Sequence, residues 1–320
     1  MTQTINTSTL AISALAAILT SAAPAVLAAS NEIAVIVKST NNNYWQNVQK
    51  GAMAVALKQP AYKVSFNGPA TEAAIADQVN MVENAVTRKV AAIVLAPSDP
   101  DALVPAIKKA WEARIPVVII DSKISDAGKK YHQSFLSTDN EAAGEQSAKA
   151  LIAQIGGTGK IAIMSYVAGS GSEVARVGGF KRYIEKNSKL QIVGTYYSQS
   201  QMATALNQTI DVLAANPDLK GLFGANEPTA VGMSRALMQS GKAGKVTAVG
   251  FDGNADLSMF VKNGTLQATA VQNSYLMGSL GVTTAIDIIA RKKVAPFINT
   301  GVVLVTKANV DLPEAKNVMY

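Results

Sequence analysis

The chain after Ser30 alternates short apolar runs with longer amphipathic segments over nearly its whole length. The short runs are rich in Val and Ile and lack a polar alternation, which is typical of strands that are buried on both faces of a parallel sheet. A regular strand–helix order indicates doubly wound α/β units. Hydrophobic residues make up 48% of the chain and charged residues 16%, so the composition is that of a globular protein.

The alternation occurs in two blocks. In the first block we expect strands at residues 33–37, 62–66, 90–95 and 116–120, and helices at residues 44–58, 71–88 and 100–113. In the second block we expect strands at residues 160–166, 191–196, 219–223, 245–250, 266–271 and 301–305, and helices at residues 140–155, 172–186, 201–215, 228–240, 255–261 and 275–291. These are too many strands for one twisted open sheet, so we predict an α/β protein with two doubly wound parallel-sheet lobes.

The first thirty residues differ from the rest of the chain. They contain no Lys, Arg, Asp or Glu, and a short apolar run at residues 10–19 is followed by Pro24 and small residues. This order predicts a secretory signal peptide over residues 1–29, with cleavage near Ala28 or Ala29. The alternative is a membrane anchor, but the apolar run is shorter than the roughly 20 residues that a span requires. The chain has no Cys, which excludes a lipoprotein anchor.

The charge pattern and the lone histidine argue against two classes of protein. The net charge is +7, but Lys and Arg are scattered and do not interleave with aromatic residues, so we expect no nucleic-acid partner. His132 is the only histidine, which disfavours a histidine-based catalytic triad and a multi-histidine metal site. The glycine-rich residues 156–160 lack the spacing of a phosphate-binding loop. We therefore expect no catalytic residues, no metal and no cofactor.

Polar residues with planar side chains follow several of the expected strands. In open α/β sheets ligands bind beyond the carboxyl ends of the strands, where loops converge. Carboxylates and amides at those ends can bond neighbouring hydroxyls of a sugar ring, although each residue alone also fits a helix cap or a turn. Their number at equivalent ends favours a shared cleft. The residues are Asp121, Asn226, Asp252 and Gln272.

The segment after the first strand combines amides with aromatic rings. Three consecutive asparagines at residues 41–43 precede Tyr44 and Trp45. A sugar can stack its C–H face on such a ring while its hydroxyls bond to amides. The alternative is a helix N-cap at Asn43 followed by two core aromatics. Arg176 also lies early in an expected helix, where it opposes the macrodipole, so it is either a cleft donor or the partner of a surface ion pair with Glu173.

With these segments in place, the chain after Ser30 resembles the type I periplasmic sugar-binding proteins, the ribose, galactose, arabinose and allose group. The resemblance extends over more than two hundred residues, in order and in spacing. The matching segments are residues 34–45, 115–121, 137–140, 175–180, 224–227, 249–252 and 270–272. The resemblance implies two lobes joined by a three-segment hinge, with crossovers near Ser137, Asn273 and Thr300. The lobes would then comprise residues 30–137 plus 273–299 and residues 138–272 plus 300–320.

The resemblance also implies which residues bind the ligand. Positions that bond or stack on sugars in ribose-type and arabinose-type binders correspond here to Lys38, Asn42, Tyr44, Trp45, Asp121, Arg176, Asn226, Asp252 and Gln272. In ribose-type binders an Arg follows the cleft Asp, but here that position is Ser122, which we include in the expected site. The aromatic residue of the second lobe is replaced by the polar residues 198–201. A different pentose, a hexose, a polyol or a substituted sugar therefore fits as well as ribose.

The function implied by the resemblance is capture of a monosaccharide, a sugar alcohol or a sugar derivative in the cleft between the lobes. The protein would act in the periplasm as a monomer and deliver its ligand to the permease of an ATP-binding-cassette importer in the inner membrane. The alternative is a LacI-type ligand-sensing regulator without its DNA-binding domain. That class requires a helix-turn-helix ahead of the first lobe, where residues 1–29 show a signal-like pattern instead. An enzyme with this fold is the third alternative.

Overall fold

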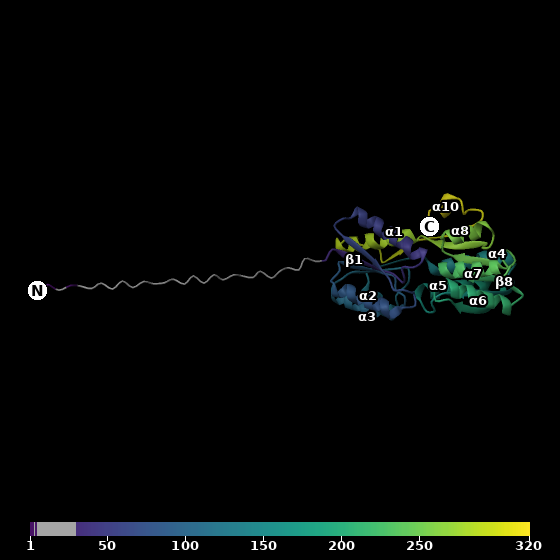
Figure 1. Cartoon of the computed structure of the whole chain (residues 1–320), viewed down its shortest axis with the longest axis horizontal. Helices are drawn as coiled ribbons and strands as arrows, with labels where there is room; N and C mark the ends of the chain where they lie inside the picture. Colours follow the sequence, from purple (N-terminus) through teal and green to yellow (C-terminus); the bar gives the residue numbers. More distant parts are fainter. Residues whose placement is uncertain (3, 5–29) are drawn as a thin grey trace.

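The computed structural model describes residues 1, 2, 4 and 30–320, so nearly all of the expected signal peptide lies outside the described residues. Two α/β lobes lie side by side, with α1 (Asn43–Lys58), α2 (Ile75–Thr87) and α3 (Val104–Glu112) in one lobe and the helices from α4 (Asn140–Ile155) to α8 (Ala255–Lys262) in the other (Figure 1). Within the described ranges no helix combines the length and the apolar character that a bilayer span needs. Each lobe is built on one six-stranded sheet; two sheet-based lobes were expected, but not the number of strands in each.

The first sheet has the strand order β11-β5-β4-β3-β1-β2 and is parallel throughout. Its strands are β1 (Glu32–Ile36), β2 (Lys63–Asn67), β3 (Ala92–Leu95), β4 (Val117–Ile120), β5 (Ser134–Ser137) and β11 (Phe297–Asn299). Side chains alternate across the sheet, as the pleat requires. Ile33 and Val35 of β1 pack with α1 (Asn43–Lys58) and α9 (Ser274–Ile289), whereas Ala34 and Ile36 pack with α2 (Ile75–Thr87) and α3 (Val104–Glu112).

The second sheet has the order β12-β10-β9-β8-β6-β7. Its strands are β6 (Thr158–Ser165), β7 (Lys189–Tyr197), β8 (Leu219–Gly224), β9 (Thr247–Phe251), β10 (Ala268–Gln272) and β12 (Val302–Thr306). Ile161 and Ile163 of β6 face the side of α4 (Asn140–Ile155) and α5 (Gly171–Asn187). Ala162 and Met164 belong to the core on the opposite face. The helices on that face are α6 (Met202–Ala215), α7 (Glu227–Gln239) and α8 (Ala255–Lys262).

Three strands differ from the pattern expected from the sequence. β5 and β11 were not expected, because the short segments SFLS and FIN carry no continuous apolar run. β12 was expected in a parallel sheet, but it pairs with β10 in the antiparallel direction. The chain enters β12 directly from the first sheet, on the side where the parallel strands of the second sheet end. It therefore has to run away from that side, against its neighbours.

The chain passes between the sheets three times: after β5, after β10, and between β11 and β12. We keep residues 30–137 plus 273–299 as the proposed N-terminal lobe and residues 138–272 plus 300–320 as the proposed C-terminal lobe. The assignment of the strands to the two sheets supports this division. Because the strands of both lobes end at the crossovers, the loops that follow them meet between the lobes.

Candidate functional site

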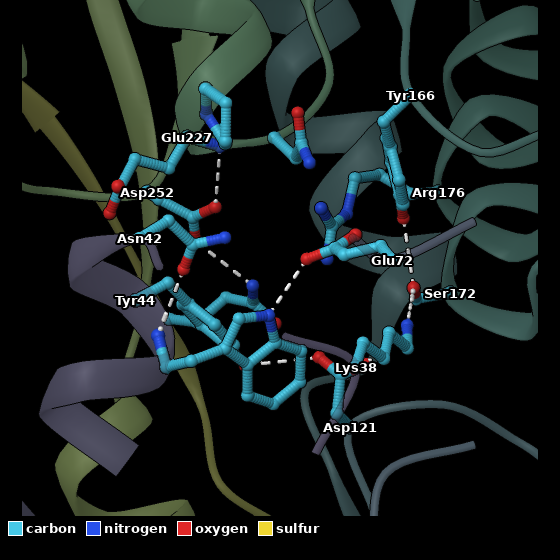
Figure 2. Close-up of a pocket in the computed structure, with 14 residues that line it drawn as sticks. Lys38, Asn42, Tyr44, Glu72, Asp121, Tyr166, Ser172, Arg176, Glu227 and Asp252 are labelled. Atoms are coloured by element: carbon cyan, nitrogen blue, oxygen red, sulfur yellow. Dashed lines mark hydrogen bonds and ion pairs between the residues drawn. The ribbon is translucent and has the colours of Figure 1, made fainter. Parts of the chain in front are cut away.

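A small cavity of about 20 Å³ lies between the lobes, and loops that follow strands of both sheets contribute to its wall. A cavity of this size holds about one water molecule, so the lobes are closed on each other. The residues that line it are Lys38, Asn42, Tyr44, Trp45, Glu72, Asp121, Tyr166, Ser172, Arg176, Asn226, Glu227, Pro228, Asp252 and Gln272. The labelled side chains approach a common centre from both sides (Figure 2).

Asp121 and Asp252 occupy equivalent places in the two lobes, directly after β4 and β9. Both have a left-handed backbone, with φ of 63° and 74°. The main-chain oxygen of Asp121 accepts a hydrogen bond from Ser137 Oγ, and that of Asp252 accepts one from Thr269 Oγ1, both at 2.7 Å. A left-handed conformation is uncommon outside glycine and is maintained only where the surroundings hold it. These matched hydrogen bonds hold both carboxylates toward the cavity.

Lys38 and Asp121 form a buried ion pair at the edge of the cavity. The Lys38 ammonium lies 2.7 Å from Asp121 Oδ2 and also donates to the hydroxyls of Ser122 at 2.5 Å and Ser172 at 3.2 Å. Tyr44 donates its hydroxyl to Asp121 Oδ1 at 3.0 Å. Burial raises the pKa of Asp121, but Lys38, Arg176 and Ser122 together outweigh it and leave this pKa below its usual value. The three N–H groups of the ammonium are all occupied by protein partners.

Asp252 is held by groups of its own lobe. Its Oδ2 accepts from the backbone N–H of Glu227 and its Oδ1 from Gln272 Nε2, both at 2.9 Å. Burial raises the pKa of Asp252 to about 6, against the opposing effect of Arg176. Gln272 Oε1 is buried and accepts no hydrogen bond from the residues that the structure describes. A buried acceptor without a donor is costly, so this oxygen is suited to a ligand hydroxyl.

Arg176 is a cleft residue and does not pair with Glu173. It is 2% exposed, and its Nε and Nη2 donate to Asn140 Oδ1 at 3.0 and 2.6 Å. Nη1 donates to the main-chain oxygen of Ala225 at 2.7 Å, and the guanidinium lies 3.6 Å from the ring centroid of Phe251. These contacts use three of the five N–H donors of a guanidinium, so two remain for a ligand.

The two cleft asparagines are also helix caps. Asn42 accepts from the backbone N–H of Trp45 at 3.1 Å at the start of α1, and Asn226 accepts from that of Thr229 at 3.3 Å at the start of α7. The expected alternative of a cap at Asn43 is therefore wrong by one residue: Asn42 is the cap, and it also lines the cavity. Tyr44 belongs both to the core of the first lobe and to the cavity wall.

Several hydrogen bonds connect the lobes across the cavity. The backbone N–H of Asn43 donates to Glu227 Oε1 at 3.0 Å, and the backbone N–H of Ser172 donates to Ser122 Oγ at 3.2 Å. Burial, together with the charge of Asp252, raises the pKa of Glu227 to about 7, although Tyr320 donates a hydrogen bond to it at 2.9 Å. These bonds and the small cavity describe a closed arrangement of the lobes.

Nine of the ten residues expected in the site line the cavity. Ser122 does not line it; its hydroxyl lies between Lys38 and the backbone of Ser172, where it joins the lobes. The residues that the sequence did not identify are Glu72, Tyr166, Ser172, Glu227 and Pro228. A signal was present for all of them, because they follow the carboxyl ends of β2, β6 and β8, where the same argument applies.

The chemistry of this site is that of binding. Carboxylates, amides and a guanidinium supply acceptors and donors, and the rings of Trp45 and Tyr166 supply apolar surface. In the described ranges, no three His, Cys, Asp or Glu side chains are grouped so that they could hold a metal ion. Such a set of planar polar groups beside rings matches a small polyhydroxylated ligand.

Comparison with known proteins relates this site to a family. A model described as a periplasmic binding protein domain matches residues 33–293. The chain is 31% identical over 274 residues to the D-allose-binding periplasmic protein of Escherichia coli, a match that covers 84% of this chain and 88% of that protein. It is 29% identical over 275 residues to the ribose import binding protein of Bacillus subtilis, covering 86% and 87% of the two chains.

Two solved structures have the same architecture. An ABC transporter solute-binding protein from Agrobacterium vitis with bound D-fucose is 70% identical, with a TM-score of 0.90, and the match covers 90% of this chain and 100% of that chain. A carbohydrate transporter solute-binding protein from Agrobacterium radiobacter in complex with D-arabinose is 33% identical, with a TM-score of 0.87 and coverage of 92% and 100%. The chain belongs to the periplasmic binding protein domain family, a family of binding proteins and not of enzymes.

Proposed function

We propose that the protein captures a neutral monosaccharide in the interlobe cavity and delivers it to an ABC importer. The observation that carries this proposal is the convergence of Asp121, Asp252, Arg176 and Gln272 from two lobes on one small cavity that ring side chains also line. Each sugar hydroxyl can both donate and accept, so a cavity of fixed acceptors and donors selects one arrangement of hydroxyls. The names of the sugar-binding relatives support the same class of ligand.

We propose D-fucose, or a sugar of the same hydroxyl arrangement such as D-galactose, as the ligand. The support is the relative from Agrobacterium vitis, which is 70% identical and contains D-fucose. The methyl group of D-fucose needs apolar surface, and Trp45 and Pro228 provide such surface in the cavity wall.

Binding would proceed by closure of the lobes. The ligand first contacts one lobe, and hinge rotation brings the groups of the other lobe against it and expels water. Hydrogen bonds to charged groups are strengthened in the closed cavity, and a sugar with a misplaced hydroxyl leaves buried groups unpaired. The hydrogen bonds of Asn43 with Glu227 and of Lys38 with Ser172 join the lobes in this closed arrangement, and opening would break them.

The proposed ligand class is tested by thermal shift and calorimetry on the exported protein, purified from the periplasm of an expressing bacterium. D-fucose, D-galactose, D-arabinose, D-allose and D-ribose are compared, because a ligand that binds only the native state raises the melting temperature. We expect D-fucose or D-galactose to give the largest shift. No shift with any of these sugars would contradict the proposed function.

The matched variants for this test are Asp252→Asn and Asp218→Asn. Asp252 lines the cavity, whereas Asp218 pairs with Lys160 on the outer surface. Removing one charged acceptor of a ligand hydroxyl is expected to weaken binding by about 1.5–3 kcal/mol. Asp252→Asn should show this loss and Asp218→Asn should not.

We further propose that residues 1–29 direct export and are removed near Ala28 or Ala29, and that the protein acts as a monomer. The export proposal rests on the sequence pattern and on the periplasmic name of the Escherichia coli relative, and the monomer proposal rests on the resemblance to the sugar-binding family. The mass of the intact protein recovered from the periplasm identifies the cleavage position, and size-exclusion chromatography with light scattering identifies the oligomeric state.

A further inference from the structure

The carboxylate of Glu72 is buried in the cavity wall and has only neutral partners. Glu72 lies in the loop between β2 and α2 and is 6% exposed. Its Oε1 accepts from the indole N–H of Trp45 at 2.7 Å, and its Oε2 accepts from the hydroxyl of Ser200 at 2.6 Å. It takes part in none of the ion pairs formed by residues 30–320. A buried charge without a counter-charge is costly for folding, which points to a role in binding.

The surroundings hold this carboxylate in place from both lobes. Trp45 belongs to the first lobe and Ser200 to the second. Ser200 has a left-handed backbone with φ of 56°, directly after Gln199 with φ of 55°, and its hydroxyl also accepts from Asn226 Nδ2 at 2.9 Å. Two consecutive residues in this uncommon conformation indicate a loop that is constrained to present the Ser200 hydroxyl to Glu72. The carboxylate points toward the centre of the cavity (Figure 2).

The cations of the cavity do not balance its carboxylates. The wall contains two cations, Lys38 and Arg176, and four carboxyl groups, those of Glu72, Asp121, Glu227 and Asp252. The ammonium of Lys38 is fully occupied by Asp121 and two hydroxyls. Burial raises the pKa values of Glu227 and Asp252, which shows that these carboxyls already lie where negative charge is disfavoured. The other cation, the Arg176 guanidinium, already acts on Asp252, so a ligand carboxylate would compete with Glu72, Glu227 and Asp252 for this one available cation.

We propose that Glu72 sets the charge selectivity of the cavity: it accepts a hydrogen bond from a hydroxyl of an uncharged sugar and excludes the corresponding acidic sugar. Each oxygen of a carboxylate has capacity for a further hydrogen bond, and a hydroxyl that donates to a carboxylate makes a strong one. A ligand carboxylate would instead face a fixed like charge at low dielectric. This inference rests on the proposed function.

The test compares D-fucose and D-galactose with D-galacturonate, which has the same ring hydroxyls but a carboxylate at C6. Affinities are measured by calorimetry on the full exported protein. We expect the wild type to bind the better neutral sugar at least about 100-fold more tightly than D-galacturonate, because juxtaposed like charges cost several kcal/mol. In Glu72→Gln, which retains an acceptor for Trp45, this ratio is expected to fall at least about tenfold.

Glu112→Gln is the matched control. It makes the same change of charge in the same lobe, but Glu112 is exposed and forms only a surface pair with Lys108. This control should retain the wild-type ratio.

The outcomes separate the two proposals. If the wild type binds a neutral sugar and D-galacturonate with similar affinity, or if D-galacturonate remains undetectable in a folded Glu72→Gln variant, sugar binding stands and the role of Glu72 is overturned. If Glu72→Gln fails to fold, the wild-type affinity ratio still tests the proposal, because similar affinities for the neutral sugar and D-galacturonate would overturn it. If the wild type binds neither D-fucose nor D-galactose, the assigned ligand fails and this proposal fails with it.

Discussion

At the scale of single residues, Asp121 and Asp252 show how neighbouring groups shift the pKa of the same residue type in opposite directions. Both follow a strand, both have a left-handed backbone and both are buried. Burial raises the pKa of each carboxyl, but only Asp121 has an ammonium within ion-pair distance, that of Lys38 at 2.7 Å. The pKa of Asp121 is therefore lowered, whereas that of Asp252 is raised to about 6. Asp121 therefore stabilises the fold through its ion pair with Lys38, in addition to lining the cavity.

This difference predicts a large loss of stability in Asp121→Asn. The substitution leaves the Lys38 ammonium, which is 3% exposed, without its counter-charge, and breaking a buried pair in this way costs about 3–5 kcal/mol. Denaturant unfolding followed by circular dichroism measures the loss. The double variant Lys38→Met/Asp121→Asn should regain much of it, because it contains no unpaired charge. An unchanged free energy of unfolding in Asp121→Asn would show that Lys38 finds another partner.

At the scale of elements, the second lobe depends on the close approach of α4 and α5. Gly144 of α4 lies against the main-chain oxygen of Arg176, and Gly179 of α5 lies against that of Glu141. A Cβ atom at either glycine would collide with that oxygen. Since Arg176 is on α5, the distance between these helices also fixes the guanidinium beside Asn140, which opens α4. Two small residues thus position a cleft donor.

Adjacent glycines of α5 provide a matched test of this contact. Gly179→Ala inserts a methyl group against the backbone of α4 and should lower the free energy of unfolding by about 1–3 kcal/mol. In Gly178→Ala the new methyl would meet only the end of the Arg182 side chain, at 3.1 Å, which can move. That variant should be about 0.5–1 kcal/mol more stable than the wild type, because Ala favours a helix interior over Gly. Equal effects at the two positions would contradict the close packing.

At the scale of the whole molecule, closure of the lobes changes the environment of Glu227. In the closed form its carboxylate is buried against the first lobe, where it accepts from the backbone N–H of Asn43. Burial is the main cause that raises its pKa to about 7, with Asp252 acting in the same direction. Opening admits water, so the pKa returns toward its usual value near 4.5. The closed form therefore binds more protons than the open form between these two pH values.

This linkage predicts that ligand affinity rises as the pH falls. Because the closed form has the higher pKa, closure takes up a proton, and lowering the pH from 8 to 6 should increase the affinity by about tenfold. The effect saturates below the pKa of the open form. Calorimetry in two buffers of different ionisation enthalpy measures the proton uptake directly. Glu227→Gln should remove most of the pH dependence, whereas exposed Glu112→Gln should keep it; a flat profile in the wild type would contradict the linkage.

Local chemistry was sufficient to predict two α/β lobes and to place several polar residues at the strand ends that line the cavity. The Val- and Ile-rich runs predicted the buried strands because a strand covered on both faces has no place for polar alternation. Residues such as Asp252 and Asn226 were identifiable because carboxyl ends of parallel strands share one edge of a sheet. β5 and β11 were not predicted, since SFLS and FIN become strands only by pairing with neighbours distant in sequence.

The tertiary structure determined which residues distant in the sequence contact each other in the cavity, and the local sequence pattern could not predict these contacts. Lys38 was expected to bond a sugar, and only the fold brings it to Asp121, 83 positions along the chain, and to Ser172 of the other lobe. Glu72 was not identified because no local pattern relates it to Trp45, 27 positions away, or to Ser200 of the other lobe. Periodicity and turn chemistry act over a few residues and therefore determine the elements. The charge balance of a cavity depends on contacts between segments that no local pattern relates.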